Sequence, residues 1–235
     1  IRFLPCEGRN LGIVARLNQG IQASSGDWVL FLDCDDLLLP SAVDVLTHYI
    51  LEHPEVRYIS SAMIDIDEGG HILRFRHRST DSESLLFEGM TAGHLKAVRR
   101  DAFEDLGLLS EAAEGCQDFE FALRLRLKEP ILFIPEFLYG YRWHADTQSV
   151  SQAMRQERTA LGVLQRLIVG QAAAEHSSLL PFRVPPPKSI VEDAAIELAV
   201  IIRTMGDRLD LLRQAVDSVL LQPRRSVAVV TVHGP

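Results

Sequence analysis

Short apolar runs alternate with helix-spaced apolar positions over the first part of the chain. Residues 1–4 and 28–32 are mostly apolar, which is typical of strands buried on both faces of a sheet. Between them, Ile13, Leu17 and Ile21 recur at the four-residue spacing of a helix. This alternation predicts an α/β fold with a mostly parallel sheet flanked by helices.

The same patterns predict further elements in the next hundred residues. Residues 119–127 alternate apolar and polar positions as a strand would, but their Glu, Ala, Leu, Arg and Lys content favours a helix. The other predicted elements are a helix after Pro40, strands at residues 56–66 and 72–75, and a turn at residues 67–70.

A break in composition divides the chain. Pro185, Pro186 and Pro187 cannot continue a helix and are typical of an extended linker. Beyond them, residues 198–202 and 227–232 read as strands, with a helix between them. We therefore expect one domain at residues 1–175, a Pro-rich linker at 176–196, and a strand–helix–strand unit at 197–235.

Charge, cysteine content and hydropathy limit the partners. The net charge of −8 and the isoelectric point of about 5.5 give no basic field for nucleic acid, so we expect no nucleic-acid partner. The three cysteines are too few and too scattered for a disulfide framework, which favours a reducing, cytoplasmic compartment. No apolar run approaches the roughly 20 residues of a transmembrane helix, and peripheral association with the inner face of the membrane stays compatible.

The motif Asp33-Cys34-Asp35-Asp36 directly follows the predicted strand at residues 28–32. Carboxyl ends of strands in open α/β sheets are where ligands bind. Two carboxylates 4 Å apart repel by roughly 4 kcal/mol at an effective dielectric near 20, so such a cluster needs a cation or a proton. Mg²⁺ and Mn²⁺ prefer such oxygen ligands. The alternative is a helix N-cap, for which a single Asp would suffice.

An ordered set of motifs extends over nearly all of residues 1–152. Its members are Asn10-Leu11-Gly12, Asn18, Gly20, Ala23, Gly26-Asp27, Phe31 to Asp36, Pro40, Gly93, Arg100, Leu106-Gly107, Gln117-Asp118, Leu123-Arg124, Tyr141-Arg142, His144, Ser149 and Ser151. Their order and spacing resemble glycosyltransferase family 2. The resemblance implies a GT-A type, Rossmann-like fold. It also implies an inverting transfer of a sugar from a nucleotide-diphosphate sugar to a glycan or lipid-linked acceptor, with Mn²⁺ or Mg²⁺.

The resemblance also assigns roles to residues of the acidic motif and to one later carboxylate. Asp33 would contact the nucleotide ribose, Asp35 would bind the metal and the diphosphate, and Asp36 would support them. Asp118 would be the catalytic base, although an N-cap role is compatible with that position. Gln117 stands where the family usually has Glu.

Residues of the late Tyr-Arg-x-His motif and of two loops are further candidates. Arg142 and His144 would reach the diphosphate or the metal; taken alone, each would be a surface charge or a satisfied core histidine. His94 and Arg100 stand where relatives contact the donor sugar or the acceptor, but they fit solvated loop residues at least as well.

In the family, a strand, a helix and a second strand come before the part that matches this chain from residue 1. Residues 198–232 resemble that opening unit. The chain would then be an interior piece of a tandem two-transferase protein, which we favour because both ends fall within motifs, or a circular permutant. In both cases residues 196–232 could dock beside the strand at Trp28, and in a permutant Thr204 would line the nucleotide site. The usual acidic ending is replaced at residues 232–235.

Two other functions stay open. A non-catalytic nucleotide-sugar or protein-binding module is favoured by Gln117 and by the altered ending at residues 232–235. A phosphatase of the haloacid-dehalogenase type would use Asp33 as its nucleophile, although Leu37 departs from the Thr or Val expected there.

Overall fold

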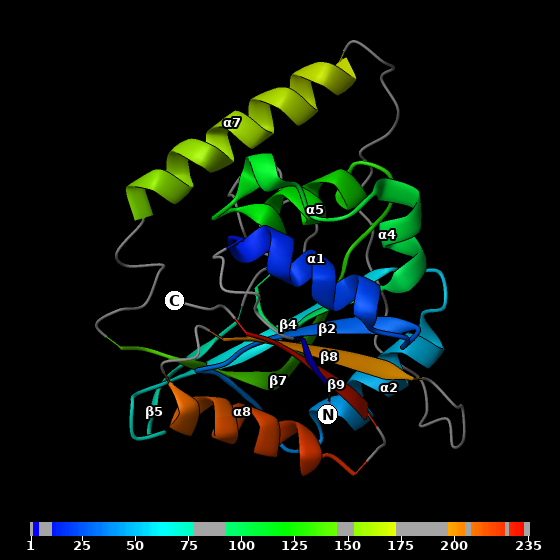
Figure 1. Ribbon diagram of the computed structural model, residues 1–235. Coiled ribbons are helices and arrows are strands. Elements are labelled where there is room, and N and C mark those ends of the chain that lie inside the picture. Colours follow the sequence, from blue (N-terminus) through cyan, green and yellow to red (C-terminus); the bar gives the residue numbers. More distant parts are fainter. Residues whose placement is uncertain are drawn as a thin grey trace.

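The computed structural model describes residues 2–4, 11–77, 93–144, 153–172, 197–204, 208–223 and 226–232. In these segments nine strands form one sheet that is covered by helices on both faces (Figure 1). The proposed linker at 176–196 lies outside the described residues, as do Asn10, Ser149 and Ser151.

Strand order places the two ends of the chain in one half of the sheet. The order is β1 (Arg2–Leu4), β9 (Ser226–Val232), β8 (Leu198–Thr204), β2 (Trp28–Asp33), β6 (Lys96–Arg99), β4 (Tyr58–Ile66), β7 (Leu132–Arg142) and β3 (Leu37–Leu38), with β5 (Ile72–Arg76) paired to β4. The first four strands run parallel. β6 is antiparallel to both β2 and β4, so the sheet is mixed. The predicted α/β fold is confirmed, but the sheet is mixed and not mostly parallel. The sequence pattern could not show this, because a run of apolar residues does not indicate the direction in which a strand pairs.

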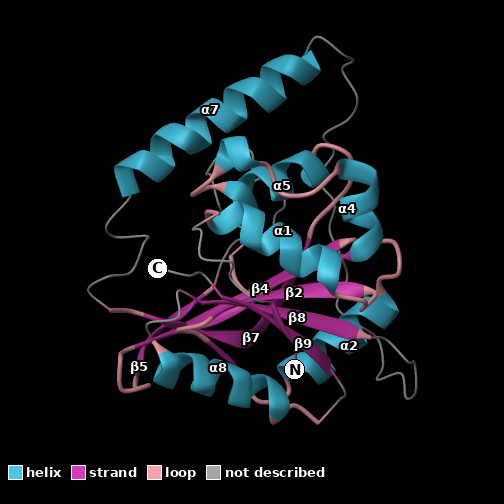
Figure 2. Cartoon of the chain, in the orientation of Figure 1, coloured by secondary structure: helices cyan, strands magenta, loops and turns pink. Residues whose placement is uncertain are grey.

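Helices cover the two faces in separate sets (Figure 2). α2 (Ala42–Glu52) and α8 (Leu209–Leu220) lie on one face. The other face carries α1 (Ile13–Ala23), α4 (Arg100–Leu106) and α5 (Gln117–Arg126), with the short 3-10 helix η1 (Glu111–Ala113) before α5 and with α7 (Ala153–Ala172) packed outside them. The helix predicted at 119–127 is therefore confirmed. None of the helices in these segments is both long and apolar enough to cross a membrane.

Strand β2 lies between two apolar cores. Trp28, Leu30 and Leu32 pack in the core beneath α2 and α8. Val29 and Phe31 face the core formed with α1, α4 and α5. Because successive side chains of a strand point to opposite faces, a strand covered on both sides needs apolar residues at every position. The uninterrupted apolar run before the acidic motif is thereby explained.

The C-terminal strand–helix–strand unit completes the sheet. β8 pairs in parallel with β2 from Trp28 opposite Leu198 to Asp33 opposite Arg203, which confirms the predicted docking beside Trp28. The turn before β2 approaches β8 so closely that a Cβ added to Gly26 would lie 2.6 Å from the backbone nitrogen of Ala199.

Side chains of α8 also bind the segment that follows the acidic motif. The backbone N–H of Leu38 donates to Ser218 Oγ at 3.1 Å. The N–H of Val43, in the first turn of α2, donates to Gln222 Oε1 at 3.2 Å. The C-terminal unit therefore buttresses the loop that carries Asp33 to Asp36.

Candidate active site

Asp33 ends β2 and is paired with an arginine of the neighbouring strand. Arg203 lies opposite it on β8, and the Nε and Nη2 atoms donate to Asp33 Oδ1 at 3.0 and 2.9 Å. Burial alone would raise the pKa of Asp33, but the charge of Arg203, helped by that of Lys96, outweighs burial and lowers this pKa to about 2. Asp33 is therefore held as a carboxylate.

Asp36 has the opposite electrostatic character. It is only 2% exposed, Oδ2 accepts from Tyr139 Oη at 2.7 Å, and Oδ1 accepts from the N–H of Arg142 at 2.8 Å. Burial, followed by the negative charges of Asp33 and Asp35, raises the pKa of Asp36 well above its ordinary value. These surroundings favour the protonated acid, and both of its oxygens are used within the protein.

Asp35 and His144, the two predicted metal ligands, lie side by side. Asp35 Oδ2 is 2.8 Å from His144 Nε2. Two ligand atoms that bind Mg²⁺ about 2.1 Å away at right angles are separated by about 3.0 Å, so the observed spacing fits an edge of an octahedral site. The pair is joined by Arg208, at the start of α8, whose Nη1 lies 3.3 Å from the same carboxylate oxygen.

The guanidinium of Arg142 is used in holding loops together. It is buried and donates from Nε to the carbonyl of Asp35 at 2.7 Å and from Nη1 to the carbonyls of Asp67 and Glu68 at 3.0 and 2.8 Å. Nη2 donates to Gln214 Oε1 on α8 at 3.0 Å. The Arg142 side chain thus holds the acidic loop in place, and both of its terminal nitrogens donate hydrogen bonds within the protein.

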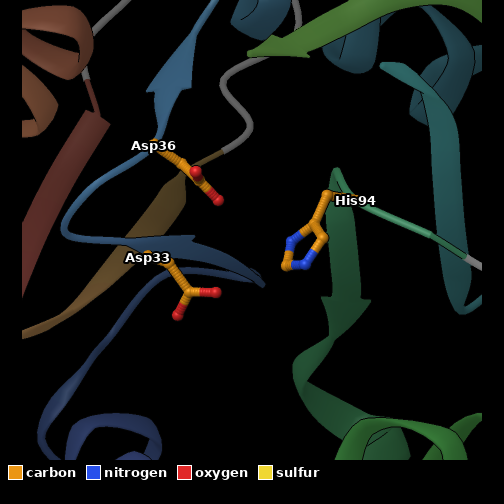
Figure 3. A group of neighbouring side chains, drawn as sticks. All are labelled: Asp33, Asp36 and His94. Atoms are coloured by element: carbon orange, nitrogen blue, oxygen red, sulfur yellow. The ribbon is translucent and has the colours of Figure 1, made fainter. Parts of the chain in front are cut away.

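His94 completes a second group of potential ligand atoms. One ligand atom each from Asp33, Asp36 and His94 lies within 4.8 Å of the others, and the imidazole points toward both carboxyl groups from the opposite side (Figure 3). The ring stacks on Tyr139 with centroids 4.7 Å apart. Burial, and then the nearby charge of Lys96, lowers the pKa of His94 to about 3, so the ring is neutral. Its Nδ1 is buried without a hydrogen-bond partner among the described residues.

Asp118, the predicted base, lies in the first turn of α5 and is ion-paired with Lys96 of β6. Its Oδ1 also accepts from the N–H of Phe119 at 2.8 Å. Burial would raise the pKa of Asp118, but the Lys96 ammonium and these hydrogen bonds lower it overall. Lys96 also influences the pKa values of Asp33 and His94, which places all four groups in one electrostatic site.

Two further candidates have different positions. Thr204 follows Arg203 at the end of β8, is 1% exposed, and hydrogen-bonds the thiol of Cys34. Arg100 lies at the other end of β2, where its guanidinium donates to the carbonyls of Gly26 and Ile21 and to Ser24 Oγ. Arg100 therefore does not join the site; it anchors the turn between α1 and β2 and is not a solvated loop residue.

Four residues at the site were not singled out from the sequence: Lys96, Tyr139, Arg203 and Arg208. The two arginines supply positive charge to the acidic motif, and burial raises the pKa of Asp36. They are about 170 positions from the motif in sequence, so nothing local pointed to them. Lys96 had a weak signal, because a lysine within an apolar strand has to find a partner.

Comparisons with known proteins point to one family of enzymes. The family model described as Glycosyl transferase family 2 matches residues 1–107, which include the acidic motif. The O-antigen biosynthesis protein RfbC of Myxococcus xanthus is 31% identical over 213 residues, covering 88% of this chain and 16% of that protein. The amylovoran biosynthesis glycosyltransferase AmsE of Erwinia amylovora is 36% identical over 148 residues, covering 61% of this chain and 55% of its own length.

A solved structure supports the fold. The crystal structure of S. aureus TarS 1–349 superposes with a TM-score of 0.52 at 16% sequence identity, covering 74% of this chain and 48% of that one. At this identity the likeness shows the GT-A type fold and nothing finer. The chain spans only part of the length of each of these relatives.

Proposed function

Because the chain belongs to glycosyltransferase family 2, we propose that it moves a sugar from a nucleotide-diphosphate sugar to a hydroxyl acceptor, with inversion at the anomeric carbon. The observation that carries this proposal is that Asp118 is ion-paired with Lys96 of β6, the strand beside β2, while Asp33 and Asp36 lie against His94. A donor site and a proton acceptor on one side of the sheet are what such a transfer requires.

Asp35 and His144 would hold the Mn²⁺ or Mg²⁺. Their ligand atoms are 2.8 Å apart, whereas both oxygens of Asp36 are bonded to Tyr139 and Arg142 and Asp33 is paired with Arg203. When bound, the ion would act as a Lewis acid for the leaving diphosphate. Asp33 would receive the ribose hydroxyls, with Thr204 beside it in the nucleotide site and Asp36 and Arg142 supporting the loop.

Asp118 would act as the base. The acceptor oxygen forms its bond to the anomeric carbon as the bond from that carbon to the diphosphate oxygen breaks, and the acceptor proton passes to the Asp118 carboxylate. The low pKa of Asp118 keeps it ionised and ready to accept the proton. The electron pair of the broken bond leaves on the diphosphate.

The acceptor would be a surface polysaccharide or its lipid-linked precursor. Support comes from the names of two relatives, which refer to O-antigen and amylovoran biosynthesis. No partner of another kind is proposed, and a cytoplasmic location, at or near the membrane, stays a prediction.

The C-terminal unit would belong to the donor half of the site. Its strands lie next to β2, and it supplies Arg203, Thr204 and Arg208. The match to RfbC covers 88% of this chain, which has to include part of residues 197–235, because these make up more than the remaining 12%. This match runs through both parts of the chain. The division at residues 175 and 197, and the choice between a tandem piece and a permutant, stay predictions.

Release of nucleoside diphosphate from a panel of nucleotide-diphosphate sugars tests the proposal, measured with Mn²⁺, with Mg²⁺ and with a chelator. We expect Asp35→Ala to abolish metal-dependent turnover. Asp118→Asn should lower turnover about 10²- to 10⁴-fold and retain donor binding. Asp217→Asn, at an exposed position of α8, is the matched control and should behave as the wild type.

Other outcomes identify other functions. Donor binding without turnover toward any acceptor would indicate the non-catalytic module that Gln117 suggested. An aspartyl-phosphate trapped on Asp33 would indicate the dehalogenase-type phosphatase, against which the family membership argues.

A further inference from the structure

Arg208 places a guanidinium nitrogen against both proposed metal ligands. Its Nη1 lies 3.3 Å from Asp35 Oδ2 and 2.8 Å from His144 Nε2, and these two ligand atoms are themselves 2.8 Å apart. The three atoms form a small triangle. A positively charged group therefore already stands beside the two atoms that would coordinate the ion.

We propose that Arg208 is a resident cation of the donor site, which contacts Asp35 and His144 before the donor binds and turns to the diphosphate when a divalent ion takes its place. This inference rests on the proposed function, because it takes Asp35 and His144 as the metal ligands. It assigns to the C-terminal unit a positioning residue for donor binding.

The two cations compete for the same atoms. When His144 coordinates an ion through Nε2, the lone pair of this nitrogen is used, so Nε2 can then neither donate to Asp35 Oδ2 nor accept from Arg208 Nη1. A guanidinium within about 4 Å of a divalent ion would also be repelled by it. Arg208 therefore has to leave Asp35 Oδ2 and His144 Nε2 when the ion binds.

A diphosphate gives the displaced guanidinium a new partner. Arginine donates two parallel hydrogen bonds to phosphate oxygens, a geometry that a lysine lacks. The ion and the diphosphate would then assist each other's binding, and by linkage the coupling is equal in both directions. The metal would bind weakly by itself and tightly with the donor.

Arg203 cannot perform the same exchange. It lies opposite Asp33 in the continuous β2–β8 pairing and is bound through two nitrogens to Asp33 Oδ1. Arg208 instead sits at the N-cap of α8, with 29% of its side chain exposed. This position at a helix end lies outside the strand pairing that fixes Arg203.

Titration calorimetry with Mn²⁺ alone, and with inorganic pyrophosphate in the presence and absence of Mn²⁺, tests the exchange on the full 235-residue chain. For Arg208→Gln we expect Mn²⁺ alone to bind about fivefold more tightly, because one competing salt bridge is gone. Pyrophosphate with Mn²⁺ should bind about tenfold more weakly, because a charge-assisted donor is lost. The coupling between the two ligands should fall accordingly.

Matched variants separate this result from a general charge effect. Arg213→Gln removes the same charge from an exposed position of the same helix and should bind both ligands as the wild type does. Arg208→Lys keeps a cation, so Mn²⁺ alone should bind near the wild-type affinity while pyrophosphate binding weakens. This variant also tests the exchange if Arg208→Gln does not fold.

The outcomes distinguish the inference from the proposed function. Unchanged or weaker Mn²⁺ binding in Arg208→Gln, together with its loss in Asp35→Ala, would overturn the exchange and leave the metal site in place. Unchanged Mn²⁺ binding in Asp35→Ala would overturn the proposed metal site and the exchange with it.

Discussion

Arg203 and Asp33 lie opposite each other in the parallel pairing of β8 with β2, and their side chains form a salt bridge of 2.9 Å. The last register position before the acidic loop thus couples the C-terminal unit to the acidic motif. Breaking this pair should affect both stability and donor binding.

We expect Arg203→Gln to lower the free energy of unfolding at pH 7 by about 2 kcal/mol, because Arg203 is the strongest of the charges that lower the pKa of Asp33 from 3.8 to about 2. Because the pKa of Asp33 is lower in the folded state than in the unfolded state, its ion pair contributes fully to stability above pH 3.8. This contribution is lost as the pH falls from 3.8 to about 2. The difference from wild type should therefore shrink when urea unfolding is repeated at pH 3. A constant difference would show that Asp33 is not the titrating partner, and Arg213→Gln is the control.

Asp36 should tolerate an amide but not a truncation. Because its environment favours the neutral acid, Asp36→Asn should change the free energy of unfolding by less than about 1 kcal/mol. Asp36→Ala leaves Tyr139 Oη and the N–H of Arg142 without their partner and should cost about 2–4 kcal/mol. Thermal or urea unfolding of the two variants measures this contrast, and equal losses would mean that Asp36 is ionised in the native state.

The pH dependence of turnover should report the pairing of Lys96 with Asp118. Lys96→Met removes the charge that lowers the pKa of Asp118, so this pKa rises. Because the base has to be unprotonated, the acid limb of the kcat/KM profile should move to higher pH. Lys128→Met, at an exposed position, serves as the control. An unmoved acid limb would argue against Asp118 as the base.

Two glycine substitutions should have opposite effects on stability. Gly26→Ala would place its Cβ 2.6 Å from the backbone nitrogen of Ala199 and should destabilise the chain by about 1–3 kcal/mol, because backbone cannot yield as a flexible side chain can. Gly162→Ala, within α7, meets only Arg166 Nη1 at 3.6 Å and should stabilise by about 0.5–1 kcal/mol. Hydrogen exchange should show faster opening of β8 in the first variant, and protected β8 amides would contradict the close approach.

Local pattern was enough for much of the fold. The apolar run before Asp33 predicted a doubly buried strand, and the four-residue spacing of Ile13, Leu17 and Ile21 predicted α1, because both periodicities arise from backbone geometry within one element. The helix at α5 required composition in addition, since alternation alone favoured a strand there.

Part of the candidate site could also be predicted. The order of motifs predicts Asp35 and His144 as metal ligands and Asp118 as the base. Asp35 and His144 lie 2.8 Å apart, and Asp118 is ion-paired with Lys96, while the roles themselves stay predictions. The resemblance did not predict which positively charged residues balance the carboxylates of the acidic motif. Arg142, expected at the diphosphate, instead binds the carbonyls of Asp35, Asp67 and Glu68.

By itself, the sequence determined the elements, the family and the carboxylates at the end of β2. Only the tertiary structure decided that β6 runs antiparallel, that Arg203 and Arg208 reach the acidic motif from the other end of the chain, and that Asp36 favours its proton. The physical reason is that strand pairing, desolvation and Coulomb interactions depend on neighbours in space. Periodicity and propensity depend only on neighbours along the chain.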